Sequence, residues 1–141
     1  MIKRRKTREV RIGDLIIGGE HAVTVQSMTT TKTDDITGTL KEVERLEEAG
    51  CHIIRITVPN KNAAKALYEI KKRMNVPLVA DIHFDYRMAL EAVDAGADKI
   101  RINPGNIGGK SRVKEVLEKV KGANLPIRIG VNAGSLEKDL I

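Results

Sequence analysis

Residues 98–109, which read DKIRINPGNIGG, decide the fold of this chain. A short β-branched run ends in a loop of asparagine and glycine, and the helix that follows keeps Val113, Val116, Leu117 and Val120 in register until Gly122. Before and after this stretch, the same unit of strand, polar loop and amphipathic helix recurs without a break in composition. Such regular alternation predicts parallel strands joined by right-handed crossovers.

The spacing of apolar residues gives the expected bounds of these units. A β-hairpin over residues 8–17, turning at Gly13 and Asp14, precedes the repeat and is expected to close one end of it. The predicted strands cover residues 22–28, 52–58, 77–82, 98–102 and 126–131. The predicted helices run from a cap at Asp34 or Asp35 to Gly50, over 61–74, over 86–95, and up to Gly122.

Two architectures fit this alternation, an open doubly wound sheet and a closed barrel. A dinucleotide-binding sheet would carry Gly-x-Gly-x-x-Gly after its first strand, where this chain has SMTTT at residues 27–31. The barrel is also favoured by the placement of polar residues in the strands. The sequence therefore predicts an α/β fold with a single domain, residues 1–141. This domain is a partial (β/α)8 TIM-type barrel of about five βα strands after an N-terminal β-hairpin.

Polar side chains lie opposite the aliphatic row in four successive strands, because side chains alternate faces along a strand. In a barrel the aliphatic row packs on the helices, and the other row points inside. Active sites of this fold lie at the carboxyl ends of the strands. The predicted inward residues are Arg55, Thr57, Asp81, His83, Arg101, Asn103, Arg128, Gly130 and Asn132.

Arg55, Arg101 and Arg128 suit a phosphate, because a guanidinium offers forked donors and keeps its charge. The alternative is a structural pairing of Arg55 or Arg101 with Asp81. Asp81 and His83 have the spacing of an acid/base pair or a metal site, although a hydrogen-bonded, orienting histidine is the commoner outcome. The loop at residues 103–109 can cradle an anion through its backbone amides, or it is an ordinary βα loop.

The overall charge agrees with an anionic partner, since the net charge is +6 and the pI is about 9.5. Aromatic residues make up only 2% of the chain, which argues against single-stranded nucleic acid. No apolar run is long enough to span a bilayer, and no secretory signal follows the basic start. We expect a cytoplasmic protein that binds neither nucleic acid nor membrane.

The single cysteine, Cys51, rules out an internal disulfide and a cysteine-based metal cluster within this chain. It opens an apolar run, which indicates a buried structural thiol. No metal ligands are predicted in this chain.

Four stretches together resemble a known family. They are VQSMT at 25–29, ADIHF at 80–84, KIRINPGNIG at 99–108 and RIGVNAGSL at 128–136. In this order they resemble the bacterial 4-hydroxy-3-methylbut-2-enyl diphosphate (HMBPP) synthase family of the non-mevalonate isoprenoid pathway. The resemblance implies reductive opening of 2-C-methyl-D-erythritol 2,4-cyclodiphosphate, with a 4Fe-4S cluster and with ferredoxin or flavodoxin as electron donor.

The resemblance also implies roles for individual residues. It maps the diphosphate contacts to Arg55, Arg101, Arg128 and Asn132. It places Asn103 in the same pocket as a substrate contact, and Asp81 and His83 there as candidate catalytic residues.

The family's barrel continues beyond this chain, and a C-terminal domain supplies the cluster ligands. The chain therefore resembles a truncated form, expected to bind no cofactor and to be inactive alone. Open edges at its first and fifth strands predict a homo-oligomer. Two other functions remain open, a phosphate-binding barrel synthase of the pterin-binding type and a basic, non-enzymatic binding or assembly module.

Overall fold

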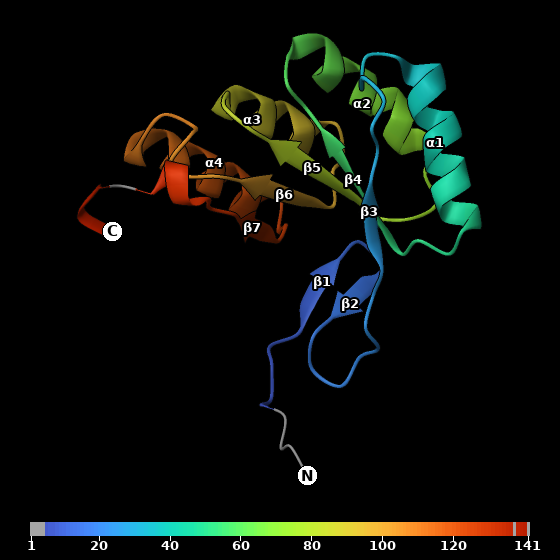
Figure 1. Ribbon diagram of the computed structural model, residues 1–141, viewed down its shortest axis with the longest axis horizontal. Coiled ribbons are helices and arrows are strands. Elements are labelled where there is room, and N and C mark those ends of the chain that lie inside the picture. Colours follow the sequence, from blue (N-terminus) through green and yellow to red (C-terminus); the bar gives the residue numbers. More distant parts are fainter. Residues whose placement is uncertain (1–4, 137, 141) are drawn as a thin grey trace.

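The computed structural model describes residues 5–136 and 138–140, and its centre is a five-stranded parallel sheet (Figure 1). The strand order is the order of the sequence, β3-β4-β5-β6-β7, so every crossover leads to the adjacent strand. In a doubly wound sheet, later strands are added on the other side of the first strand, so the strand order differs from the sequence order. In the wall of a barrel the two orders are the same. The bounds are β3 Gln26–Met28, β4 Ile53–Thr57, β5 Leu78–Ile82, β6 Lys99–Ile102 and β7 Ile127–Ile129.

Four α-helices form one layer on a single face of this sheet, each packed beside the next (Figure 1). They are α1 Ile36–Glu48, α2 Lys61–Lys72, α3 Tyr86–Asp94 and α4 Lys110–Gly122. Asp35, Asn60 and Asp85 cap the first three helices, because each side chain accepts a hydrogen bond from a backbone amide of the first turn. Two short 3-10 helices follow β7, at Ala133–Ser135 and Lys138–Leu140.

The main core lies between the sheet and the helices, where the aliphatic rows of the strands were expected. Ile54, Ile56, Ile100 and Ile102 are fully buried there. Leu67 of α2 belongs to the same cluster. The alternation of the strands thus assigns the opposite, polar row to the other face of the sheet.

The predicted hairpin is present, with β1 Val10–Ile12 paired antiparallel to β2 Leu15–Ile17. Its Ile12 is fully buried in a second, smaller cluster with Ile53 and Val79. These two residues lie near the amino ends of β4 and β5, so the hairpin covers that end of the sheet (Figure 1).

The two outer strands are shorter than the sequence indicated. The prediction of a strand over residues 22–28 was wrong at its beginning, since only Gln26–Met28 pairs, and it pairs with β4 alone. Val23 is 89% exposed, because the neighbouring strand begins only at Ile53 and offers it no ladder partner. The fifth strand likewise ends at Ile129 rather than at Val131.

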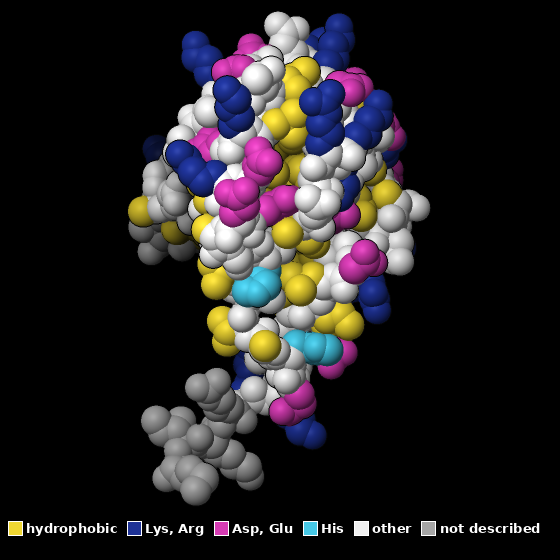
Figure 2. Space-filling view, turned by 90° about the vertical axis from the view of Figure 1, so that its right-hand side faces the viewer, with side chains coloured by type: hydrophobic (Ala, Val, Ile, Leu, Met, Phe, Trp, Pro, Cys, Tyr) yellow, Lys and Arg dark blue, Asp and Glu magenta, His cyan; other side chains and the backbone are white. Residues whose placement is uncertain are grey.

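The surface over α1 carries charges of both signs. Figure 2 shows lysine, arginine, aspartate and glutamate side chains interspersed on that face, without a large field of one sign. Among the residues that the structure describes, no helix combines the length and hydrophobicity needed to cross a membrane.

Candidate functional site

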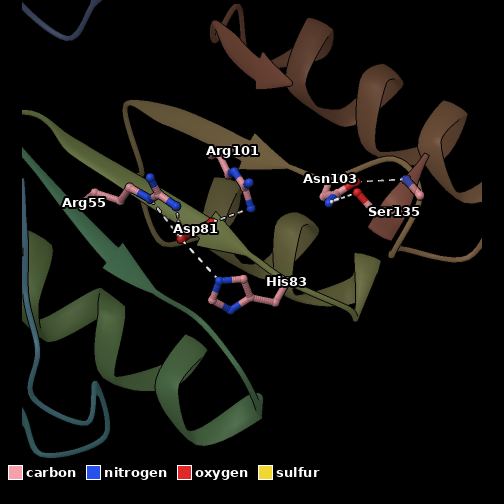
Figure 3. Close-up of polar contacts among 7 residues, drawn as sticks. Arg55, Asp81, His83, Arg101, Asn103 and Ser135 are labelled. Carbon is pink, nitrogen blue, oxygen red and sulfur yellow. Dashed lines mark hydrogen bonds and ion pairs between the residues drawn. The ribbon is translucent and has the colours of Figure 1, made fainter. Parts of the chain in front are cut away.

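Asp81 is the centre of the polar face of the sheet, and two arginines converge on it (Figure 3). Its side chain is fully buried, and its Oδ2 accepts hydrogen bonds from Arg55 Nε at 2.9 Å and Arg55 Nη2 at 2.6 Å. Its Oδ1 accepts a longer bond from Arg101 Nη1 at 3.3 Å. One carboxylate therefore holds two guanidinium groups in place.

The register of the sheet explains this meeting. Asp81 of β5 lies directly opposite Thr57 of β4 on one side and Arg101 of β6 on the other. Arg55 is two residues before Thr57 on the same face, so its long side chain reaches Asp81 diagonally. The structure thus brings together three of the residues that the sequence placed inside the barrel.

His83 lies next to this cluster and directly follows the carboxyl end of β5. Its Nε2 is 3.4 Å from Asp81 Oδ2, and its side chain is 41% exposed. The exposed ring of Phe84 lies beside it, with the two ring centroids 6.1 Å apart. His83 therefore lies beside a buried carboxylate and remains open to solvent, which is a suitable setting for proton transfer.

Asn103 and Ser135 belong to a second polar group, separate from the Asp81 cluster (Figure 3), and Asn132 joins it through Ser135. Buried Asn103 donates from Nδ2 to Ser135 Oγ at 2.9 Å and accepts from the amide of Gly105 at 3.2 Å. Ser135 Oγ also accepts from the amide of Asn132 and donates to its carbonyl. The loops after β6 and β7 are therefore joined through one hydroxyl group.

Sequence reasoning did not single out Ser135, although it lies in one of the stretches that resemble the family. Its role depends on how two loops meet, and the spacing of residues along the strands gives no signal for that.

Arg128 lies in register beside Arg101 on the polar face and is exposed. Within the described part of the chain it forms no ion pair. Lys99, also on this face, is only 8% exposed and has no ion pair within the same residues. Burial and the nearby charge of Arg128 lower the pKa of Lys99 below its usual value of 10.5. Sequence reasoning missed Lys99, although the alternation that identified Arg101 also places Lys99 inside.

The loop that follows β3 is fixed by Glu42 of α1, another residue that sequence reasoning missed. Its carboxylate accepts hydrogen bonds from the amide and hydroxyl of Thr30 and from the amide of Thr31. Burial raises the pKa of Glu42, but these hydrogen bonds outweigh burial and hold it below 4.5. This loop leaves the sheet at the same end as His83.

Comparison with known proteins gives the family of this chain. Residues 7–141 match the sequence profile of the GcpE TIM-barrel domain. The chain belongs to the GcpE TIM-barrel family. The partial barrel predicted from the sequence and the family resemblance are both confirmed.

The similar GcpE relatives are longer than this chain. A protein of Listeria monocytogenes is 61% identical over 140 residues, and one of Geobacillus kaustophilus is 59% identical over 141 residues. Both are named 4-hydroxy-3-methylbut-2-en-1-yl diphosphate synthase (flavodoxin). The match covers 99% and 100% of this chain but 38% of each relative. The chain thus spans well under half the length of the curated relatives it matches.

Solved structures share the GcpE fold at low identity. Dihydropteroate synthase of Yersinia pestis has a TM-score of 0.68 at 18% identity, covering 93% of this chain and 49% of that enzyme. The Vibrio fischeri enzyme has a TM-score of 0.65 at 17% identity, covering 87% and 48%. At this identity the likeness shows a shared barrel architecture and carries no conclusion about substrate.

Proposed function

We propose that this chain is the diphosphate-binding, N-terminal part of a 4-hydroxy-3-methylbut-2-en-1-yl diphosphate synthase, and that residues 1–141 form one domain. The substrate is 2-C-methyl-D-erythritol 2,4-cyclodiphosphate. Its ring opens with uptake of two electrons and two protons and loss of one water, giving 4-hydroxy-3-methylbut-2-enyl diphosphate. The names of the long relatives support this activity.

One observation carries the proposal, which is the excess of positive charge on the polar face. Arg55, Arg101, Lys99 and Arg128 all lie on this face, and Asp81 forms ion pairs with the first two of them. A single negative charge cannot balance these cations, so the face favours a polyanion. A diphosphate matches this excess, and guanidinium groups bind it through charge-assisted hydrogen bonds.

The residues then divide into two roles. Arg55, Arg101 and Arg128 bind the diphosphate, while Asp81 holds the first two in position. His83 is the group that would hold or move a proton near the substrate, because it lies 3.4 Å from Asp81 and solvent reaches it.

Asn103 and Asn132 contribute to the same pocket from its second polar group. Ser135 joins their two loops, and the buried side chain of Asn103 is hydrogen bonded at both its nitrogen and its oxygen, so this part of the wall of the site is rigid.

The 4Fe-4S cluster of the reaction does not fit the residues present here. Cys51 is the one cysteine of the sequence, and it is buried before β4, at the end of the sheet away from His83. The residues that the structure describes contain no group of three His, Cys, Asp or Glu side chains placed to hold a metal. We therefore assign the cluster ligands to a part of the protein outside this chain, and no step of the reaction to Cys51.

The remaining proposals concern partners and location. Electrons come from flavodoxin, as the relatives' names indicate, or from ferredoxin. This chain alone, without the cluster ligands, is inactive. The protein works in the cytoplasm as a homo-oligomer and binds neither nucleic acid nor membrane.

The test is calorimetric binding of the cyclic diphosphate to this chain and to Arg128→Gln. We expect the unmodified chain to bind and the affinity of the variant to be about tenfold lower, as for the loss of one charge-assisted donor. Lys114→Gln, at an exposed position of α4, is the matched control and should bind normally. Equal binding by Arg128→Gln, or binding of a pterin in place of the diphosphate, would contradict the proposal.

A further inference from the structure

Gly130 directly follows β7, at a position where the lack of a side chain has a structural consequence. Its amide donates to the carbonyl of Ile102 at 2.9 Å, so its backbone is fixed to β6. Because side chains alternate faces along a strand, a side chain at position 130 would point inward, like that of Arg128. The backbone of Gly130 is outside the left-handed region, so its conformation does not require glycine.

The guanidinium of Arg101 fills the space where a side chain at Gly130 would lie. A β-carbon at Gly130 would be 2.5 Å from Arg101 Nη2, 2.7 Å from Nε and 2.9 Å from Cζ. Real β-carbons essentially never approach other atoms so closely. Any side chain at this position would therefore displace the guanidinium.

Arg101 is thus held from two sides. Asp81 Oδ1 accepts from its Nη1, and Gly130 lies against its Nε and Nη2. The guanidinium is the flexible end of a long side chain, so an alanine at Gly130 would move it while the fixed backbone stayed in place. Glycine also weakens a strand, so we expect a packing or functional reason for a glycine at this position.

We propose that Gly130 is a positioning residue for the diphosphate site, whose lack of a side chain sets the place of Arg101. This inference deepens the proposed function and rests on it for the ligand. The relation between Gly130 and Arg101 can be measured without any ligand.

The first experiment follows the Nε–Hε signal of Arg101 by NMR, using Arg101→Ala to assign it. In Gly130→Ala this signal should shift, because the guanidinium loses its place beside Asp81. Gly134→Ala is the matched control, since a β-carbon there meets nothing within 4 Å and its backbone is also outside the left-handed region. An Arg101 signal that is unchanged in Gly130→Ala would overturn the inference.

The second experiment is a double-mutant cycle on the unfolding midpoint in urea, which also decides the case if Gly130→Ala folds poorly. Gly130→Ala should lower the midpoint when Arg101 is present and have no effect when Arg101→Ala has emptied the space. Equal losses in both backgrounds would mean that the backbone requires glycine, and would overturn the inference.

The third experiment measures binding of inorganic diphosphate by calorimetry. Gly130→Ala should bind about tenfold more weakly, as for one misplaced charge-assisted donor, while Gly134→Ala should bind normally. Equal binding by Gly130→Ala and the unmodified chain would overturn the positioning role. An unmodified chain with no affinity for diphosphate would instead contradict the proposed function, and the two ligand-free experiments would still decide where Arg101 lies.

Discussion

Arg55 donates two hydrogen bonds to the same oxygen of Asp81, from Nε at 2.9 Å and from Nη2 at 2.6 Å. The carboxylate is fully buried, so its charge depends on the guanidinium groups for compensation. This contact joins β4 to β5 and connects the stability of the sheet with the geometry of the proposed diphosphate site.

Asp81→Asn is expected to destabilise the chain, because it leaves Arg55 and Arg101 close together without a counter-charge. The free energy of unfolding should fall by about 3 kcal/mol, as when one partner of a buried pair is removed. Urea unfolding measures this loss. Glu118→Gln, which breaks an exposed pair with Lys114, is the control and should change little. Similar effects of the two substitutions would contradict the structural role of Asp81.

Glu42 is expected to make the chain sensitive to acid. Its pKa is lowered in the folded state, so its stabilising contribution is present above 4.5 and is lost as the pH falls through the folded pKa. Glu42→Gln should cost about 1 kcal/mol at neutral pH, the usual contribution of such hydrogen bonds. Urea unfolding at pH 3 to 7 should show a weaker pH dependence in the variant. An unchanged pH dependence would refute this prediction.

Lys99 is expected to reduce the stability of this chain. Its pKa is lowered by burial, so the unfolded state binds more protons, and stability should rise as the pH increases toward 10.5. Lys99→Met removes the buried charge and should raise the free energy of unfolding at neutral pH by about 1 kcal/mol. It should also flatten the alkaline part of the curve, measured by thermal unfolding at several pH values. A less stable Lys99→Met would show that the ammonium group has a stabilising partner.

Ser135→Ala is expected to loosen the wall formed by the loops after β6 and β7. The substitution leaves the Nδ2 of buried Asn103 without its acceptor, which costs about 1 to 2 kcal/mol. Hydrogen exchange should increase at the amide of Asn132, which donates to the same hydroxyl. Ser111→Ala, at an exposed position in α4, serves as the control. Unchanged exchange at Asn132 would mean that backbone contacts alone hold these loops.

Self-association is expected through the outer strands of the sheet. Ile129 and Val131 are 52% and 54% exposed around the end of β7, and β3 pairs on one side only. Unpaired strand edges with exposed apolar residues favour pairing between chains. Light scattering should give a mass above that of one chain, and Ile129→Glu should lower it. A monomeric mass for the unmodified chain would contradict the expected homo-oligomer.

The fold could be predicted because burial repeats along the strands with a fixed period. Ile54 and Ile56 alternate with Arg55 and Thr57, and this pattern defined both the core and the polar face. The outer strands were less predictable, because apolar residues such as Val23 have strand-like composition without a strand to pair with.

The face of the sheet on which these polar residues lie was predictable, but their contacts were not. The sequence placed Arg55, Arg101 and Arg128 on one face and offered Arg55 or Arg101 as the partner of Asp81, whereas the structure pairs Asp81 with both. This double pairing depends on register, which makes Asp81 the direct neighbour of Arg101 and the diagonal neighbour of Arg55. Ser135 was not recognisable because it acts across two loops, whose approach no strand periodicity encodes.

The hairpin at the beginning of the chain has a consequence for biosynthesis. Ile12 leaves the ribosome before Ile53 and Val79, the two other buried residues of its cluster. A two-stranded ribbon is marginally stable by itself, so the hairpin cannot be locked in place until β4 and β5 have formed. The hairpin therefore settles only after these later strands have formed, and until then its apolar side chains are open to chaperones.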